Sequence, residues 1–328
     1  MTVDDPFEDA VYDPQSPSLL KYDAKVLRGK NGRLFLDNDR NNVIKQLTGE
    51  LRFSDQQLLE WRALLEARVS WLDKRGCRYF FLVAVNAHLV YPEDLPDHIR
   101  PATTRPIHQL LDHLEETESN ARLIYPLDEI LAAKPHPLLF PRTDTHWTGH
   151  SAYIAYRMLA REVSSVMPMH VVSEEDLVFY EVQWMGDLGF KVEPKDESIT
   201  VSTSVKRPAA RLISDNRVIN TGLVVVTECP GAPDVRCVVF GDSSVHAMLP
   251  SLSSSFRHVV FAIGVTVDRE FVREQRPDVV ISLMNERLMT TVPDDVGEMT
   301  VREQERMKKA KGLVRDRVLP HWPHLDPP

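Results

Sequence analysis

A serine stands where a predicted strand leads into a predicted helix. Residues 236–240 form an apolar run, Gly-Asp-Ser-Ser follows at 241–244, and helical spacing begins at residue 245. This arrangement presents the hydroxyl of Ser243 at the strand end, where the N–H groups of the helix start can stabilise an oxyanion. Asp242 is expected to fix the turn by accepting backbone N–H bonds. Because Asp and Ser are also favoured helix N-caps, the tetrapeptide alone is better explained by capping.

A serine nucleophile needs a general base, and the base needs a carboxylate that orients it. Asp144 and His146 lie two residues apart, after a predicted strand at 138–140. In an extended segment such side chains point the same way, so the carboxylate can hold one imidazole nitrogen while the other faces the serine. A structural histidine beside a capping aspartate is the alternative. Since both motifs follow predicted parallel strands at their carboxyl ends, the sequence predicts a Ser243–His146–Asp144 triad.

Further polar residues follow the predicted strands. Asn86 comes after the apolar run 79–85, and it either offers its amide to an oxyanion or closes the loop through an Asx-turn. Tyr91 in the same loop either lines a sugar site or packs. Glu286 and Arg287 follow the last strand, and a structural ion pair between them is the better explanation. The other candidates for oxyanion or substrate contacts flank the predicted triad: Arg142, Trp147, Asp242 and Ser244.

The composition limits the classes of protein to consider. Of 328 residues, 43% are hydrophobic and 27% are charged, which is ordinary for a globular protein with a large core. The net charge of -9 argues against a nucleic-acid-binding protein, which usually carries a basic excess. No apolar run is long enough to span a bilayer, and residues 1–6 lack the basic and apolar regions of a signal peptide. We therefore expect a cytoplasmic protein.

The sequence contains none of the motifs that would indicate a metal site or redox chemistry. The three cysteines form no CxxC pair, and Cys77 and Cys237 lie beside strand-like runs, where buried inert thiols are the better explanation. His321 and His324 are spaced as HxxH, but the surrounding prolines prevent a helix there. The chain contains no GxGxxG, Walker or HExxH motif. We expect no metal and no bound cofactor.

Apolar strand-like runs alternate with helical segments along the chain. The runs at 79–85, 236–240, 258–263 and 278–283 are typical of strands covered on both faces. The alternation predicts an α/β fold in three layers, α/β/α, around a parallel sheet. We expect the chain to divide into an N-terminal arm (1–27), a catalytic domain (28–292) with a mixed, partly antiparallel insertion (about 176–235), and a C-terminal helix with a Pro-rich tail (293–328).

Together these motifs resemble the SGNH-hydrolase-like domain of the alginate O-acetyltransferase family. The specific part is Asp-Thr-His-Trp at 144–147, followed later in the chain by Gly-Asp-Ser at 241–243. Softer matches lie at 29–36, 71–76, 86–96, 186–188, 277–281 and 286–287. Ordinary SGNH hydrolases place Gly-Asp-Ser first, so the motif order here is circularly permuted, as in that family.

The resemblance implies that Ser243 is the nucleophile, His146 the general base and Asp144 its orienting partner. The implied reaction is O-acyl transfer onto a hydroxyl of a carbohydrate or glycosylated metabolite through an acyl-serine. The resemblance implies acetyl as the transferred group. An acyl donor then serves as co-substrate, and an acyl-donor protein is a candidate partner. An esterase with the same triad and a non-catalytic carbohydrate-binding module are the alternatives.

Two departures from the family pattern bear on the substrate. Members often carry Pro-Asn-Lys where this chain has Val-Asn-Ala at 85–87, and Gly-His-Ser at 149–151 replaces the usual small-residue turn. Members usually act on exported polysaccharide outside the cytoplasmic membrane. A cytoplasmic chain would instead meet soluble substrates, such as a nucleotide sugar, a glycoside or a small metabolite.

Overall fold

The computed structural model describes residues 26–134 and 137–316. The predicted N-terminal arm lies almost wholly outside the described residues, as do the Pro-rich tail and its two histidines, His321 and His324. The division into an arm, a catalytic domain and a C-terminal segment stays a prediction.

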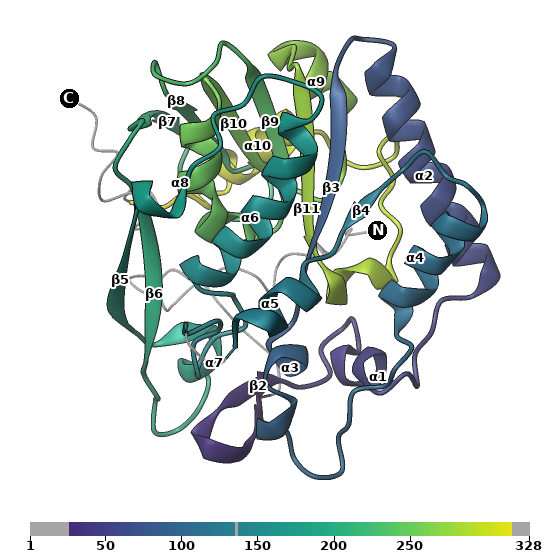
Figure 1. Ribbon diagram of the computed structural model, residues 1–328, viewed down its shortest axis with the longest axis vertical. Coiled ribbons are helices and arrows are strands. Elements are labelled where there is room, and N and C mark those ends of the chain that lie inside the picture. Colours follow the sequence, from purple (N-terminus) through teal and green to yellow (C-terminus); the bar gives the residue numbers. More distant parts are fainter. Residues whose placement is uncertain (1–25, 135–136, 317–328) are drawn as a thin grey trace.

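A mixed sheet lies at the centre of the molecule (Figure 1). Its parallel part consists, in spatial order, of β4 (Leu123–Ile124), β3 (Arg78–Ala84), β11 (Val279–Asn285), β9 (Arg236–Gly241) and β10 (His258–Ile263). Beyond β10 the sheet continues with two antiparallel strands, β8 (Val224–Glu228) and β7 (Arg211–Asp215). The sheet is therefore mainly parallel, as predicted.

Helices cover both faces of this sheet (Figure 1). On one face lie α5 (Leu127–Ala133), α6 (Gly149–Ser164) and α8 (Val245–Ser255). On the other face lie α2 (Asp55–Asp73), α4 (Pro106–Glu116), α9 (Arg269–Gln275) and α10 (Val301–Ala310). Neighbouring residues of one strand face opposite layers: Phe81 packs with α2 and α4, and Leu82 packs with α6. The predicted three-layer α/β/α class is confirmed.

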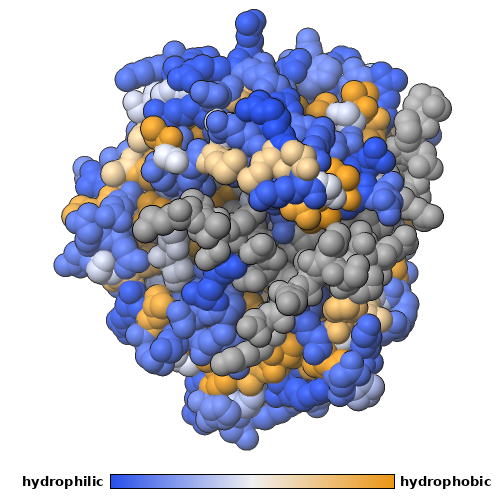
Figure 2. Space-filling view, turned by 180° about the vertical axis from the view of Figure 1, so that it is seen from behind, coloured by the Kyte–Doolittle hydropathy of each residue, from blue (hydrophilic) through white to orange (hydrophobic). Residues whose placement is uncertain are grey.

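Short elements complete the fold around one end of the sheet. They are β1 (Val26–Arg28), β2 (Leu34–Leu36), α1 (Val43–Leu47), α3 (Ala87–Val90), α7 (Gly186–Gly189), and the 3-10 turns η2 (Lys30–Gly32), η3 (Pro92–Asp94), η4 (Glu174–Asp176) and η5 (Glu286–Thr290). A separate hairpin of β5 (Leu177–Trp184) and β6 (Ser198–Val205) stands beside α6 and α8 (Figure 1). Figure 2 shows the molecule from behind the view of Figure 1. Its surface there is largely hydrophilic, with hydrophobic residues in small separate patches.

One detail of the predicted organisation is wrong. Residues 138–140 form no strand: Leu139 and Phe140 are buried, but the N–H of Leu139 bonds to the Tyr91 hydroxyl at 3.3 Å and its carbonyl accepts the N–H of Thr148 at 3.0 Å. The segment 176–235, predicted as a mixed and partly antiparallel insertion, contains antiparallel strands. Its second half supplies β7 and β8, whose apolar residues extend the central sheet past β10.

The helix before β3, α2, has a capping box at its start and a glycine just after its end. The hydroxyl of Ser54 accepts the N–H of Gln57 at 3.3 Å, and the Gln57 side chain returns to the N–H of Ser54 at 3.1 Å, which completes a capping box. Past the C-terminus, Gly76 adopts a φ of 70°, a left-handed conformation that favours glycine. The chain then enters β3 directly.

A buried ion pair ties α2 to the segment after β11. Arg68, only 2% exposed, donates from Nε and Nη2 to the two oxygens of Asp295, at 2.8 and 2.7 Å. Its remaining donors reach the Tyr79 hydroxyl at 3.1 Å and the carbonyl of Val265 at 3.0 Å. One side chain thus joins a helix, a strand and two loops.

Replacing Arg68 with Met should lower the free energy of unfolding by about 3–5 kcal/mol, because the Asp295 carboxylate would stay buried without its partner. Urea denaturation measures the change. The double variant Arg68→Met/Asp295→Leu should recover much of the loss. Arg62→Met is the matched control, since its ion pair with Glu66 is about one-third exposed and worth roughly 0–1 kcal/mol. A loss at Arg68 no larger than at Arg62 would contradict this account.

Candidate active site

Three side chains form a continuous hydrogen-bonded chain. The hydroxyl oxygen of Ser243 lies 2.7 Å from Nε2 of His146, and Nδ1 of His146 lies 2.7 Å from Oδ1 of Asp144. Ser243 comes from the turn between β9 and α8, whereas the other two come from the loop before α6. The structure therefore brings together the three residues that the sequence predicts as a triad.

The Asp144 carboxylate is buried, with 3% of the residue exposed, and both its oxygens accept hydrogen bonds. Oδ1 also accepts the backbone N–H of His146 at 2.8 Å, and Oδ2 accepts Nε1–H of Trp184 at 2.5 Å. Trp184 is the last residue of β5. The sequence analysis missed it, because nothing in the alternation of the hairpin signals a contact with a loop forty residues earlier.

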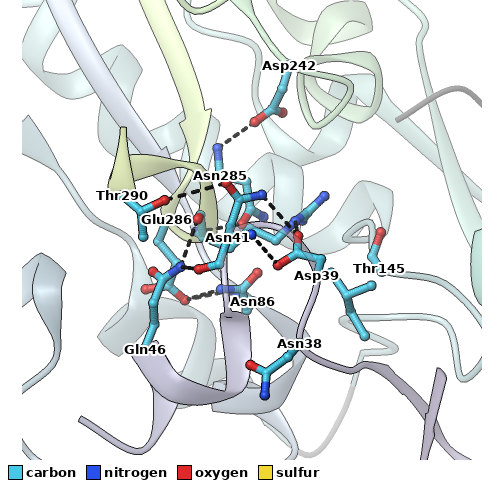
Figure 3. Close-up of polar contacts among 12 residues, drawn as sticks. Asn38, Asp39, Asn41, Gln46, Asn86, Thr145, Asp242, Asn285, Glu286 and Thr290 are labelled. Atoms are coloured by element: carbon cyan, nitrogen blue, oxygen red, sulfur yellow. Dashed lines mark hydrogen bonds and ion pairs between the residues drawn. The ribbon is translucent and has the colours of Figure 1, made fainter. Parts of the chain in front are cut away.

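Asp242 fixes the turn that carries the serine. Its Oδ1 accepts the N–H of Ser244 at 2.7 Å, and its Oδ2 accepts the N–H of Asn285 at 2.6 Å, at the carboxyl end of β11 (Figure 3). The carbonyl of Ser244 accepts the indole N–H of Trp147 at 2.9 Å. Gly241 permits the close approach, because an added Cβ would lie 2.6 Å from the carbonyl oxygen of Leu283.

Burial and charge act in opposite directions on this pair of ionisable groups. Burial disfavours the imidazolium, but the Asp144 carboxylate outweighs it and raises the pKa of His146 to about 9. Burial likewise opposes ionisation of Asp144, yet the charge of His146 and its hydrogen bonds lower the pKa of Asp144 to about 2. Each group thus stabilises the charged form of the other.

The predicted ion pair between Glu286 and Arg287 is wrong. Oε1 of Glu286 accepts the backbone N–H and the side-chain amide of Asn86, both at 3.0 Å, and Oε2 accepts the Tyr125 hydroxyl at 2.6 Å (Figure 3). Consecutive residues in a helical turn do not face each other, so Arg287 points elsewhere, with Nε 3.8 Å from Oδ2 of Asp39. The amide of Asn86 is thereby engaged by Glu286, which favours its loop-closing role over an oxyanion contact.

Two other candidates brace the surrounding loops. The guanidinium of Arg33 lies over the ring of Tyr91, with its Cζ 3.6 Å from the ring centroid, and the Tyr91 hydroxyl accepts the N–H of Leu139. These contacts favour packing, one of the two roles considered for Tyr91 from the sequence. Arg142 donates to both oxygens of Asp196 at 2.8 and 2.7 Å and to the carbonyl of Gly32 at 2.6 Å. These bonds engage Arg142 within the protein, away from the Ser243 hydroxyl.

The loop before α1 adds a polar cluster that the sequence analysis missed. Both oxygens of Asp39 accept hydrogen bonds from Asn41, at 2.9 and 3.0 Å, and Gln46 donates to the carbonyls of Asn41 at 2.7 Å and Arg287 at 2.9 Å (Figure 3). The positive charge of Arg287 lowers the pKa of His146, whereas the carboxylates of Asp144 and Asp187 raise it. The run of Asn and Asp at 37–42 was the available signal.

Within the described residues, one group of side chains has the donor types of a metal site. Oxygen or nitrogen atoms of Asp144, His146 and Asp187 lie within 4.8 Å of one another. Both imidazole nitrogens of His146 are already hydrogen-bonded, to Asp144 and to Ser243. The hydrogen bonds from His146 to Asp144 and to Ser243 therefore explain why these side chains lie so close together. Across the same described ranges, every helix is too short or too polar to cross a membrane.

The chain matches known proteins over most of its length. Residues 26–201 match a family model described as the SGNH hydrolase-like domain of acetyltransferase AlgX. A probable alginate O-acetylase AlgJ of Pseudomonas syringae pv. tomato is 26% identical over 152 residues, which are 46% of this chain and 36% of that protein. The match thus spans about a third of the relative's length.

Solved structures share the fold at low identity. Bacillus cereus PatB1 is 13% identical with a TM-score of 0.62 over 83% of this chain and 100% of that chain. The O-acetyltransferase domain of Pseudomonas putida AlgJ is 17% identical with a TM-score of 0.54, over 87% and 99%. Pseudomonas aeruginosa AlgX is 14% identical with a TM-score of 0.53, over 92% and 70%. The resemblance stated from the sequence is confirmed.

Replacing Asp144 with Asn should lower the pKa of His146 markedly from about 9, because the largest charge that opposes burial is then removed and, of the two carboxylates that raise this pKa, Asp187 alone remains. Histidine NMR titration measures it directly and requires no substrate. Asp97→Asn, which removes a carboxylate whose side chain is 90% exposed, is the control and should leave the midpoint unchanged. A midpoint that stays at about 9 in Asp144→Asn would show that another group sets it.

Proposed function

Since the chain belongs to the family of SGNH hydrolase-like acetyltransferase domains that includes AlgX, we propose that it is a serine O-acyltransferase. The acceptor in this proposal is a hydroxyl of a carbohydrate or a glycosylated metabolite. The observation that carries it is the chain from Ser243 Oγ through His146 to Asp144, with both links at 2.7 Å. The names of AlgJ and its O-acetyltransferase domain support acetyl as the transferred group and a carbohydrate as the acceptor.

The first half of the reaction forms the acyl-enzyme. His146, in its neutral form, takes the proton of Ser243 through Nε2 while Oγ attacks the carbonyl carbon of the acyl donor. Asp144 holds Nδ1–H and stabilises the imidazolium that forms. At the start of α8 the N–H groups of Ser244 and Val245 already bond within the turn, to the side chain and the carbonyl of Asp242, so they are not free to stabilise the oxyanion that the attack forms. When the intermediate collapses, His146 returns the proton to the leaving group and the acyl-serine remains.

The second half transfers the acyl group. An acceptor hydroxyl gives its proton to Nε2 of His146 and attacks the acyl carbon. Collapse of the second intermediate releases the ester and returns the proton to Ser243. The same residues therefore act in both halves, and the acyl donor is the only co-substrate that the chemistry requires. An acyl-donor protein remains a candidate source of that group.

An esterase with the same residues is the second candidate function. The side chain of His146 is 26% exposed, so water can reach the base. Water competes with a bound acceptor at the acyl-serine step, and the acceptor prevails only if the site orients it. Transfer and hydrolysis thus differ in the acceptor and not in the nucleophile.

Incubation with p-nitrophenyl acetate should add one acetyl group to the protein, seen by intact-protein mass spectrometry, with a burst of p-nitrophenol. Ser243→Ala should abolish both while remaining folded by circular dichroism. Ser165→Ala, at the exposed end of α6, is the control and should acquire the adduct normally. An adduct that persists in Ser243→Ala would sink the proposal.

A panel of soluble oligosaccharides and glycosides then separates the two candidate functions. Under the transferase proposal, an acceptor should raise the rate of deacylation and appear as its acetyl ester by mass spectrometry. Acetate as the sole product with every acceptor, at an unchanged rate, would favour the esterase.

The rate should also rise with pH. The base must be neutral to accept the serine proton, and the Asp144 carboxylate holds the pKa of His146 at about 9. The kcat/KM for acylation should therefore be low below neutral pH and increase as His146 loses its proton in the alkaline range. A stopped-flow pH profile checks the direction. A profile that is flat or that falls between pH 6 and pH 9 would contradict the role of His146 as base.

A further inference from the structure

A second buried carboxylate reaches the segment between the base and its partner. Asp187 lies in α7, and its two oxygens accept the backbone N–H of Thr145 at 2.8 Å and the Thr145 hydroxyl at 2.5 Å. Thr145 separates Asp144 from His146 in the chain. The sequence analysis quoted Asp187 within a matching segment but gave it no role.

We propose that Asp187 is a positioning residue of the acid–base pair, which holds the Asp144–His146 segment through Thr145 and keeps a second negative charge beside the imidazole of His146. This role rests on the proposed function, because it concerns the base of that reaction. It goes beyond the three-residue chain, since it adds a group that touches neither the nucleophile nor the acyl donor.

The hydrogen bonds explain how Asp187 sets the geometry. Thr145 lies in a bend between Asp144 and His146, whose backbone N–H folds back onto the Asp144 carboxylate at 2.8 Å. Asp187 holds both the N–H and the hydroxyl of Thr145, so it fixes the backbone of the bend that carries the two side chains. A short bond from a hydroxyl to a carboxylate, such as the one at 2.5 Å, is typical of an ionised acceptor. Both oxygens accept and neither donates, which also fits the ionised form.

The local sequence is adapted to this close approach. Gly186 has a φ of 71°, and a Cβ there would lie 2.1 Å from the carbonyl oxygen of Thr143. A Cβ on Gly189 would lie 2.0 Å from the carbonyl oxygen of Asp196. The N–H groups of Leu188 and Gly189 donate to the Thr143 carbonyl at 3.1 and 3.0 Å. Gly186 therefore lets α7 dock against the segment that carries the base, and Gly189 admits the chain at Asp196 beside it.

Charged groups from several elements face the imidazole. Asp144 lies in its own loop, Asp187 in α7, and Arg287 after β11, while the Ser243 hydroxyl approaches from the start of α8. Burial raises the pKa of Asp187, and so does the charge of Asp144, whereas His146 and Lys191 lower it. The two carboxylates outweigh Arg287 at His146. Removing one of them makes the imidazolium less stable.

Asp187→Asn removes the charge but keeps the size and an acceptor for Thr145. The midpoint of the His146 NMR titration should fall by about one pH unit, the effect of losing an opposite charge at short range. The acidic limb of the rate profile should shift by the same amount. Asp187→Glu, which restores the charge, should return the midpoint toward that of the natural chain. Glu181→Gln, which removes an exposed carboxylate from β5, is the matched control and should leave it in place.

Thr145→Val tests positioning apart from charge. It removes the hydroxyl bond and leaves the carboxylate, so turnover should fall roughly tenfold while the midpoint stays near that of the natural chain, the signature of one lost hydrogen bond to a charged group. If Asp187→Asn does not fold, this variant decides the matter, and unchanged turnover would overturn the proposal.

The two proposals fail in different ways. An unchanged His146 midpoint in folded Asp187→Asn overturns the role of Asp187, even where Ser243→Ala abolishes the acetyl adduct. Absence of any serine-dependent adduct overturns the acyltransferase, and the titration still reports whether Asp187 acts on His146, because it needs no turnover.

Discussion

The site depends on one charged hydrogen bond, between Asp144 and His146, whose carboxylate is buried away from water. A buried carboxylate is costly unless hydrogen-bond donors replace its hydration. Here the donors are the imidazole, the backbone N–H of His146 and the indole N–H of Trp184. Because these donors come from the loop before α6 and from β5, the pair needs both segments in place. The hairpin outside the central sheet is therefore part of the site.

Ser243, the proposed nucleophile, is held from the opposite direction. Asp242 ties the turn after β9 to the end of β11, and Trp147 ties Ser244 to the loop that carries the base. Neighbouring parallel strands end at the same edge of the sheet, so a short polar turn suffices to fix the serine. Ser243 and His146 thus meet across 2.7 Å, and the bond from Trp147 to Ser244 is a second link between the two segments that carry them.

The sequence predicted those parts of the site whose geometry depends on residues adjacent in the chain. The strand before Gly241 and the spacing of Asp144 and His146 follow from adjacent residues, and the expectation that sites lie at the carboxyl ends of parallel strands joined the two motifs. Contacts between distant segments could not be read this way. Trp184 and Asp187 reach the site because the hairpin and α7 pack there, and no spacing specifies that packing. Residues 138–140 have the apolarity of a strand, but side-chain partners satisfy their backbone, as Thr148 does for Leu138 at 2.6 Å.

The contacts of Trp184 and Asp187 link the proposed reaction to the hairpin and to α7, which follows β5 in the chain. Trp184 binds the oxygen of Asp144 that faces away from His146, so a shift of β5 acts first on the carboxylate and only then on the base. Asp187 follows three residues later and acts on the same segment through Thr145. One short stretch, 184–187, therefore supports both the orientation and the charge of the acid–base pair. A ligand that moved this stretch would change the rate of the chemical step as well as its own affinity, since binding and base orientation share the same hydrogen bonds.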